Sequence, residues 1–340
     1  MLKKIIGPII FVVIALIIWW LIGPKPIKIN AFVGGEKIGF INDPLIINIL
    51  EEKYNIVVDA VKAGSIEMVT TLNVDGKDVL WPSNPIALEI WKNSNRPFLS
   101  DDSIFLSPIV LYSYDIVTKA LIQEQIVEKR SDFYYVVNFR KMIEYIIGQK
   151  SWEDIQLPEL YGKITIFSTD PTKSNSGNMF AGLMANILNH GNVVTMETVD
   201  NILPEMKKYF ERCGYMEDSS GDIFNNFIST GVGAKPIIVG YENQLSEYII
   251  ENEKFINNKI RILYPVPTIW STHPMIALKK NGKILIEALK DKKIMKIAWE
   301  KHGFRSSHEI SQRRIKVPEI EYVVQMPNAA VMNKIIDELK

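Results

Sequence analysis

The segment TDPTKSNSGN, residues 169–178, contains the residue types that bind a small polar molecule through hydrogen bonds. It follows a predicted strand, 163–168, and precedes a predicted apolar helix, 179–188. Its hydroxyls and free backbone N–H groups then lie at a helix N-terminus, where the helix dipole favours an anion. Such residues are also common in helix caps and turns, so a purely structural role stays open. The candidate ligand-binding residues here are Thr169, Ser174, Ser176 and Gly177.

Small and polar residues also follow three predicted strands nearer the N-terminus, 27–33, 56–60 and 78–81. In an open parallel sheet, the turns after the strands lie at one edge, which is where ligands bind. Lys37 is the nearest cation to this edge, and Ser65 is expected to cap the helix that follows it. The candidate residues at this edge are Gly35, Lys37, Ser65, Ser83 and Asn84.

Tyr241 and Glu242 follow another predicted buried strand, 236–240, and are expected at the corresponding edge of a second sheet. Glu242 is suited to accept hydrogen bonds from a hydroxylated or cationic ligand, or to close a cleft against the other domain. It is equally suited to open the next helix, where acidic residues are favoured.

Motifs for enzymatic chemistry are missing from the sequence. The four histidines have no HExxH spacing, and Cys213 is the single cysteine, so there is no cysteine pair for zinc. The Walker A, G-x-S-x-G and dinucleotide-binding motifs are absent too. The sequence therefore predicts a protein that is not an enzyme and has no metal or cofactor. His273, near a predicted hinge, is expected to be a structural hydrogen-bonding residue.

The arginines narrow the expected ligand, because receptors for carboxylates usually bind them with a bidentate guanidinium. No arginine lies in the turns described above. Amino acids and dicarboxylates are therefore disfavoured, and small oxyanions or neutral polar solutes remain.

Short β-branched runs alternate with turns and helical segments along the chain, which predicts an α/β fold with mainly parallel sheets. The helix from Pro44 has Asp43 as its expected N-cap, and residues 115–148 are expected to be mostly helical. Crossings near Ser107 and Tyr264 predict two lobes. The first comprises residues 25–107 and 265–340, and the second comprises 108–264.

The N-terminal residues 1–24 predict a membrane anchor. Lys3 and Lys4 precede an uncharged run, 5–22, which as a helix is roughly 27 Å long, enough for a bilayer core. The lysines favour a cytoplasmic N-terminus with the remaining chain outside the membrane. A cleaved signal would need a small-residue cleavage site, which this run lacks. A lipoprotein cysteine is absent, and a buried core helix rarely ends in two tryptophans.

Composition limits the possible partners. Without Lys3 and Lys4 the chain has 37 basic and 39 acidic residues, a net charge of −2. Nucleic acid is therefore not an expected partner. One cysteine permits no internal disulfide, so the exported part must be stabilised by its core.

Several segments resemble those of bacterial extracellular solute-binding proteins of type II, and their order covers nearly the whole chain beyond the anchor. These segments are FVGGEK (32–37), VKAGS (61–65), WPSN (81–84), SPIV (107–110), DP (170–171) through SG (176–177), YE (241–242), YP with PT (264–268), and WEKHGFR (299–305). The resemblance implies two α/β lobes, joined by two crossover strands, that close over a solute. It is nearest to the branch of molybdate-type oxyanion receptors.

By that resemblance, ligand contacts are expected from hydroxyl and backbone N–H groups. The residues implied are Ser65, Ser83, Ser174, Ser176 and Gly177. The expected partners are the membrane subunits of an ABC transporter or another envelope protein, with a monomeric receptor domain. An interaction or sensor subunit of an envelope complex, retaining the fold without transport, is the alternative.

Overall fold

The computed structural model describes residues 25–251, 259–306, 316–320 and 322–339. The predicted anchor, residues 1–24, lies outside this part of the chain. Among the described residues, no helix has both the length and the apolar character needed to cross a bilayer.

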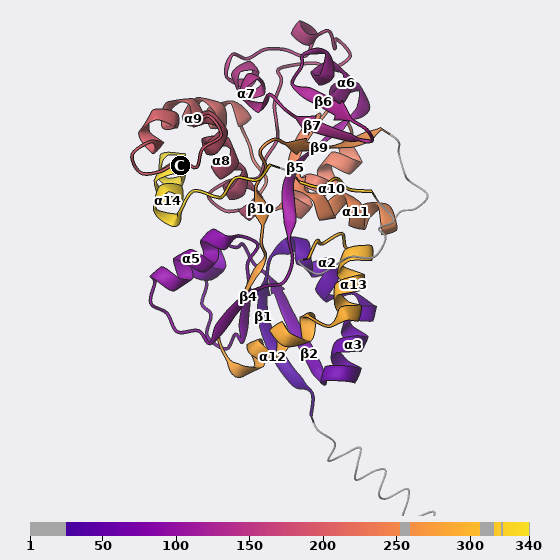
Figure 1. Cartoon of the computed structure of the whole chain (residues 1–340), viewed down its shortest axis with the longest axis vertical. Coiled ribbons are helices and arrows are strands. Elements are labelled where there is room, and N and C mark those ends of the chain that lie inside the picture. The colour runs from indigo at the N-terminus through magenta and orange to yellow at the C-terminus, as the bar shows by residue number, and fades with distance from the viewer. Residues whose placement is uncertain (1–24, 252–258, 307–315, 321, 340) are drawn as a thin grey trace, which may run out of the picture.

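The first lobe contains a five-stranded sheet in the order β2-β1-β3-β11-β4 (Figure 1). The strands are β1 (Ile27–Val33), β2 (Ile56–Lys62), β3 (Val79–Trp81), β4 (Ser100–Ser103) and β11 (Pro274–Ala277). Strands β1, β2 and β3 are parallel, whereas β11 is antiparallel to both of its neighbours. The helices are η1 (Gly35–Lys37), α2 (Ile38–Ile41), α3 (Pro44–Tyr54), α4 (Glu67–Thr70), α5 (Pro85–Asn93), α12 (Lys280–Leu289) and α13 (Lys292–Glu300).

The second lobe is built around β5, which pairs with β8, β9 and β10. Its strands are β5 (Ser107–Tyr114), β6 (Val127–Arg130), β7 (Phe133–Val136), β8 (Ile237–Tyr241), β9 (Ile260–Pro265) and β10 (Trp270–Ser271). Its helices are α6 (Asp115–Gln123), α7 (Phe139–Ile147), η2 (Glu153–Ile155), α8 (Asn175–Leu188), α9 (Val199–Cys213), α10 (Ser220–Thr230), α11 (Glu242–Glu251) and α14 (Ala329–Glu338). The largest apolar core surrounds α8, which is buried along its whole length.

Strands β5 and β10 run from one lobe into the other (Figure 1). After α13 the chain returns to the second lobe, where Val331, Met332 and Ile335 of α14 join the core around α8. The predicted range 265–340 had assigned this C-terminal helix to the first lobe. Its apolar face is instead buried in the core of the second lobe against α8 and α9, and the helix also contacts α5 of the first lobe.

One predicted helix cap is present, and another helix has a cap that was not predicted. Asp43 accepts a hydrogen bond from the backbone N–H of Leu45 at 2.8 Å, as expected. Asn84, expected only as a ligand-binding residue, caps α5 by accepting from the N–H of Ile86 at 2.9 Å. The prediction that Ser65 caps a helix is wrong, because α4 has no side-chain cap. Ser65 Oγ instead accepts the backbone N–H of Ser83 at 2.9 Å, which links the ends of two strands.

Two predicted elements differ in the structure. Residues 115–148 contain the β6–β7 hairpin between two helices, because the aromatic and β-branched run 133–137 pairs back on β6 across a turn at Ser131, where φ is 53°. The segment 163–168 forms single bridges and no strand. Lys163 pairs with Ser151, whereas Phe167 pairs with Ile238, so its two ends have different partners.

Candidate functional site

A cavity of about 330 Å³ lies between the two lobes, which suits a small solute. Both lobes contribute the edges of their sheets and the N-termini of helices to its lining. The first lobe contributes Gly34, Gly35, Glu36, Lys62, Ala63, Gly64, Ser65 and Glu67. The second contributes Lys173, Ser174, Asn175, Ser176, Asp218, Ser219, Ser220, Asp222 and Tyr241.

Two helix N-termini of the second lobe open into this cavity. Helix α8 begins after Ser174 and α10 begins after Ser219, and neither of these residues caps its helix with its side chain. The first-turn N–H groups therefore lie near the cavity without a side-chain acceptor at the cap. Ser176 Oγ lies 2.7 Å from Thr169 Oγ1 and 3.3 Å from Ser174 Oγ, which forms a row of hydroxyls. Together these groups favour a negatively charged or polar head.

Asn175, the first residue of α8, has one satisfied and one unsatisfied side-chain atom. Its Nδ2 donates to Tyr241 Oη at 2.6 Å. Its Oδ1 has no hydrogen-bond partner among the described residues, although the side chain is only 7% exposed. Burial and the negative charge of Glu36 raise the pKa of Tyr241 well above its ordinary value, so the phenol stays protonated. An acceptor oxygen and a hydroxyl donor thus lie side by side in the cavity wall.

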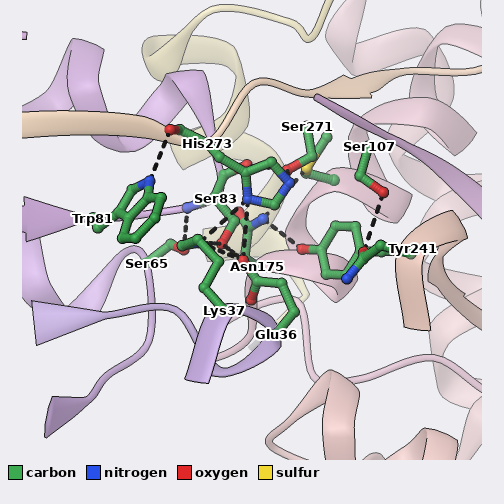
Figure 2. A network of polar contacts seen from close by, with 12 residues as sticks. Glu36, Lys37, Ser65, Trp81, Ser83, Ser107, Asn175, Tyr241, Ser271 and His273 are labelled. Atoms are coloured by element: carbon green, nitrogen blue, oxygen red, sulfur yellow. Dashed lines mark hydrogen bonds and ion pairs between the residues drawn. The ribbon is translucent and has the colours of Figure 1, made fainter. Parts of the chain in front are cut away.

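Behind the cavity lies a group that we call the central cluster, made of Glu36, Lys37, Ser83 and His273 (Figure 2). Lys37 Nζ donates to Ser83 Oγ at 2.7 Å, contacts His273 Nδ1 at 3.2 Å and pairs with Glu36 Oε1. An ammonium group has three N–H bonds, and these three acceptors use all of them. Lys37 is fully buried, so it is an internal counterion and faces away from the cavity.

Electrostatics keep the Glu36–Lys37 pair charged and His273 neutral. Burial by itself raises the pKa of Glu36, but the adjacent Lys37 ammonium group holds that pKa well below its ordinary range. Burial lowers the pKa of Lys37, and Glu36 opposes this. Burial and the Lys37 charge lower the pKa of His273 to about 4. The cluster therefore carries one negative and one positive charge at neutral pH.

The neutral His273 ring continues the hydrogen-bond network to the backbone. Because Nδ1 accepts from Lys37, the ring proton lies on Nε2, which is 3.2 Å from Ser271 Oγ. Ser271 Oγ in turn donates to the carbonyl oxygen of Ser83. Trp81 Nε1 donates to the carbonyl oxygen of His273 at 3.1 Å. The expected structural role of His273 agrees with these contacts.

Glycine is required next to this cluster at position 34. A Cβ atom on Gly34 would lie 2.6 Å from Ser83 Oγ and 2.8 Å from Lys37 Nζ. Real Cβ atoms do not approach other atoms so closely, and the two partners are fixed by the network. The GGEK sequence thus lets the chain pass directly over the buried charge pair.

The predicted ligand-binding residues fall into two groups in the structure. Those that line the cavity are Gly35, Ser65, Ser174, Ser176 and Tyr241. Those that do not line it are Lys37, Ser83, Asn84, Thr169, Gly177 and Glu242. Lys37 and Ser83 belong to the central cluster, and Thr169 lies behind Ser176.

The other three predicted residues that do not line the cavity, Asn84, Gly177 and Glu242, have contacts that explain their positions. Asn84 Nδ2 donates to Asn178 Oδ1 at 3.0 Å, a contact between the lobes. A Cβ atom on Gly177 would lie 2.1 Å from the carbonyl oxygen of Thr169, so glycine permits close packing there. Glu242 is fully buried and accepts from Arg305 at 2.8 Å (Nε) and 2.6 Å (Nη2), and from Tyr264 at 2.9 Å.

The sequence predictions omitted several cavity residues. Glu36 stands between two predicted residues, Gly35 and Lys37, of which Lys37 is the cation nearest to this edge. Asn175 lies inside the predicted loop, where the hydroxyls of serine and threonine give the stronger signal for an anion site. Lys62 lies past the predicted end of its strand, and the Ser219-Ser220 pair at the start of α10 is a helix-start signal that could have indicated these residues.

Among the described residues, no group of three or more His, Cys, Asp or Glu side chains is arranged to hold a metal ion.

Comparison with known proteins identifies the fold. No protein-family model matches the chain, and no curated protein matches it in sequence. Iron-bound HitA from Pseudomonas aeruginosa has a TM-score of 0.59 and 12% identity, covering 92% of this chain and 99% of that one. Apo ferric ion-binding protein A from Pasteurella haemolytica has a TM-score of 0.52 and 14% identity, covering 92% and 94%. The sulfate-binding protein SubI from Mycobacterium tuberculosis has a TM-score of 0.50 and 12% identity, covering 84% and 88%. The predicted α/β class is confirmed, and the chain has the fold of periplasmic solute-binding proteins.

Proposed function

We propose that this protein is a membrane-tethered, extracytoplasmic solute-binding receptor that captures a small polar solute by closure of its two lobes. The observation that carries the proposal is the cavity of about 330 Å³ that both lobes line with glycines, hydroxyls and two helix N-termini. Such a cavity binds a polar solute through backbone and side-chain hydrogen bonds. Similar structures with this fold include proteins named for iron and sulfate binding, which supports a receptor role.

Closure is the mechanism that the contacts between the lobes support. Lys62 Nζ of the first lobe lies 3.1 Å from Ser219 Oγ of the second, at the edge of the cavity. Asn84 and Asn178 meet 3.0 Å apart on another side of it. A solute that contacts both lobes stabilises the closed form by its extra affinity for that form. Strands β5 and β10, which pass between the lobes, are the natural hinge.

The proposed location and partners rest on the sequence. The uncharged run 5–22 after two lysines supports a cytoplasmic N-terminus with the lobes outside the membrane. The proposed partners are the membrane subunits of an ABC transporter. Protease added to intact cells should digest the lobes only if they face outward. Protection from protease until the cells are opened would contradict this location.

A thermal-shift screen tests the receptor function. The full-length chain in mild detergent is heated with molybdate, sulfate, phosphate, sugars or small amino compounds, because a ligand that binds only the folded form raises Tm. Ser174→Asp should abolish the shift caused by an anion. Aspartate is a favourable N-cap, so the fold survives while its charge repels the solute. Asn328→Asp, at the N-cap of α14, adds the same charge away from the cavity and should leave the shift intact. No shift with any solute favours the alternative, an interaction or sensor subunit of an envelope complex.

A further inference from the structure

The charges around the cavity do not suit a simple inorganic oxyanion. Four acids line the cavity, Glu36, Glu67, Asp218 and Asp222, against two lysines, Lys62 and Lys173. Lys37 adds one positive charge behind the wall, and each of the two helix N-termini adds roughly half a charge. The sum is close to zero without a solute. A dianion would therefore leave the closed cavity with an uncompensated negative charge.

The positive groups are also largely occupied by the protein itself. All three donors of Lys37 are used within the central cluster. Lys173 Nζ lies 3.0 Å from Asp218 and 3.7 Å from Asp170. Lys62 contacts a hydroxyl and has no carboxylate within ion-pair distance among the described residues. The free positive character is thus concentrated near Lys62 and the N-termini of α8 and α10, at one side of the cavity.

Another side of the cavity has acceptor oxygens that receive no hydrogen bond from the described residues. The contacts of Glu36 with Lys37, Ser83 and His273 in the described structure all use Oε1, and none of them uses Oε2. The Glu36 side chain is only 4% exposed, yet it lines the cavity. Asn175 Oδ1, on the opposite lobe, is buried and has no hydrogen-bond partner among the described residues. Figure 2 shows both side chains in the group around Tyr241. An unsatisfied buried acceptor such as Asn175 Oδ1 is costly, and a solute with several N–H donors could donate both to it and to the cavity-lining Glu36 carboxylate.

We propose that the solute is zwitterionic, with an ammonium group that binds between Glu36 and Asn175 and an anionic head near Lys62 and the N-termini of α8 and α10. This inference rests on the proposed receptor function and names the solute class of its cavity. Because Glu36 and Asn175 belong to different lobes, the ammonium group itself links the lobes and promotes closure. The expectation from the sequence disfavoured amino acids and dicarboxylates because no arginine lies in the turns. This proposal revises it for amino acids, since helix N-termini would hold the anionic head instead.

Matched solutes test the proposal by calorimetry on the full-length chain. The ammonium compounds 2-aminoethylphosphonate and β-alanine are compared with ethylphosphonate and propionate, which keep the head but lack the ammonium group. At least one ammonium compound should bind tenfold or more tightly than its partner, since charge-assisted hydrogen bonds have this strength. Equal affinity within both pairs, or binding of sulfate, molybdate or a sugar alone, would overturn the zwitterion while leaving the receptor function intact. No binding by any of these solutes would count against both.

Two variants identify the ammonium contacts. Glu36→Gln should lower affinity for the ammonium compound about tenfold or more and leave the ammonium-free compound unchanged. Asn175→Asp should raise the ratio of the two affinities at least fivefold, because it adds a carboxylate at the same place, and an acid at a helix start does not destabilise the helix. Glu242→Gln is the matched control for loss of a buried glutamate charge and should change neither affinity. An unchanged ratio in Asn175→Asp would overturn the proposal even if Glu36→Gln fails to fold.

Discussion

Glu36 in the first lobe and Glu242 in the second are both buried carboxylates beside a cation, but their hydrogen bonds are distributed differently. Glu242 has a partner on each oxygen, because the Arg305 guanidinium contacts both and Tyr264 adds a third bond. Glu36 crowds Lys37 and Ser83 onto Oε1 and leaves Oε2 at the cavity. Two buried ion pairs of the same charge type therefore have different roles: one holds a segment in place, and the other keeps an oxygen available for a solute.

The largest expected effect tests whether Glu36 depends on its internal counterion. Lys37→Met should lower the free energy of unfolding by about 4 kcal/mol, because it leaves a buried carboxylate without a cation. Chemical denaturation measures this. The double variant Glu36→Gln, Lys37→Met should recover most of the loss, since neither charge remains. Lys62→Met, at an exposed lysine of the same lobe, serves as the control. A Lys37→Met variant as stable as that control would show that the cluster is not stabilised by its ion pair.

The pH dependence of stability separates the two glutamate sites further, because only the Glu36 side contains a buried neutral histidine. The pKa of His273 is about 4 in the folded chain, below its ordinary value of 6.5. The unfolded chain then binds more protons between these pH values, so stability falls as pH decreases from about 6.5 to 4. The loss from this residue is about 3 kcal/mol over that range. Denaturation at several pH values should show a shallower decline in His273→Gln, and identical slopes would contradict this assignment.

Glu242→Gln tests the other member of the comparison. The variant keeps the shape of the side chain but removes the charge that pairs with Arg305, whose side chain is 14% exposed. Loss of charge-assisted hydrogen bonds should lower the free energy of unfolding by about 2 kcal/mol. Affinity for the solute should stay within twofold, as measured by calorimetry. If affinity falls as much as it does in Glu36→Gln, the distinction between the two carboxylates is wrong.

The fold was largely predictable because strongly apolar runs bounded by turns mark most strands. The runs at 27–33, 107–112, 236–240 and 260–264 correspond to β1, β5, β8 and β9. The β6–β7 hairpin was missed because Glu128, Lys129 and Arg130 make β6 polar, so its strand character depends on pairing with β7. The location of α14 depends on its tertiary contacts with α8 and α9, which the local sequence pattern does not reveal.

The candidate site was predictable at the level of segments but not of side chains. Strand order places the Gly34-Gly35 and Ser174–Ser176 turns at the cavity. Which of two adjacent side chains faces the cavity depends on the backbone conformation of the turn that carries them. Gly35–Lys37 forms a single 3₁₀ turn, which directs Lys37 inward and leaves Glu36 at the surface of the cavity. The start of α10 contributes Ser219 and Ser220 to the cavity lining, but it is far in sequence from the other lining segments. Its position at the cavity can therefore be recognised only from the tertiary structure.

A third carboxylate, Glu247, belongs neither to the central cluster nor to the lining of the cavity, but it joins the two lobes. His302 lies 2.8 Å from Asp43 in its own lobe and 2.7 Å from Glu247 Oε1 on α11 of the other lobe. Gly39 permits this approach, because a Cβ atom there would lie 2.3 Å from the same Glu247 oxygen. The contact joins the lobes away from the cavity, so it should favour the closed form without contacting the solute.

Glu247→Gln should accordingly weaken solute affinity by up to about fivefold, equivalent to roughly 1 kcal/mol of lost preference for the closed form. Small-angle X-ray scattering of the free protein should show a larger radius of gyration, and saturating solute should restore the radius of the parent chain. Glu144→Gln removes an exposed partner of Arg140 within the second lobe and should change neither quantity. The ammonium selectivity inferred for Glu36 and Asn175 should persist in Glu247→Gln, because closure strength and solute recognition depend on different carboxylates. A change in that selectivity would mean that Glu247 acts on the cavity itself.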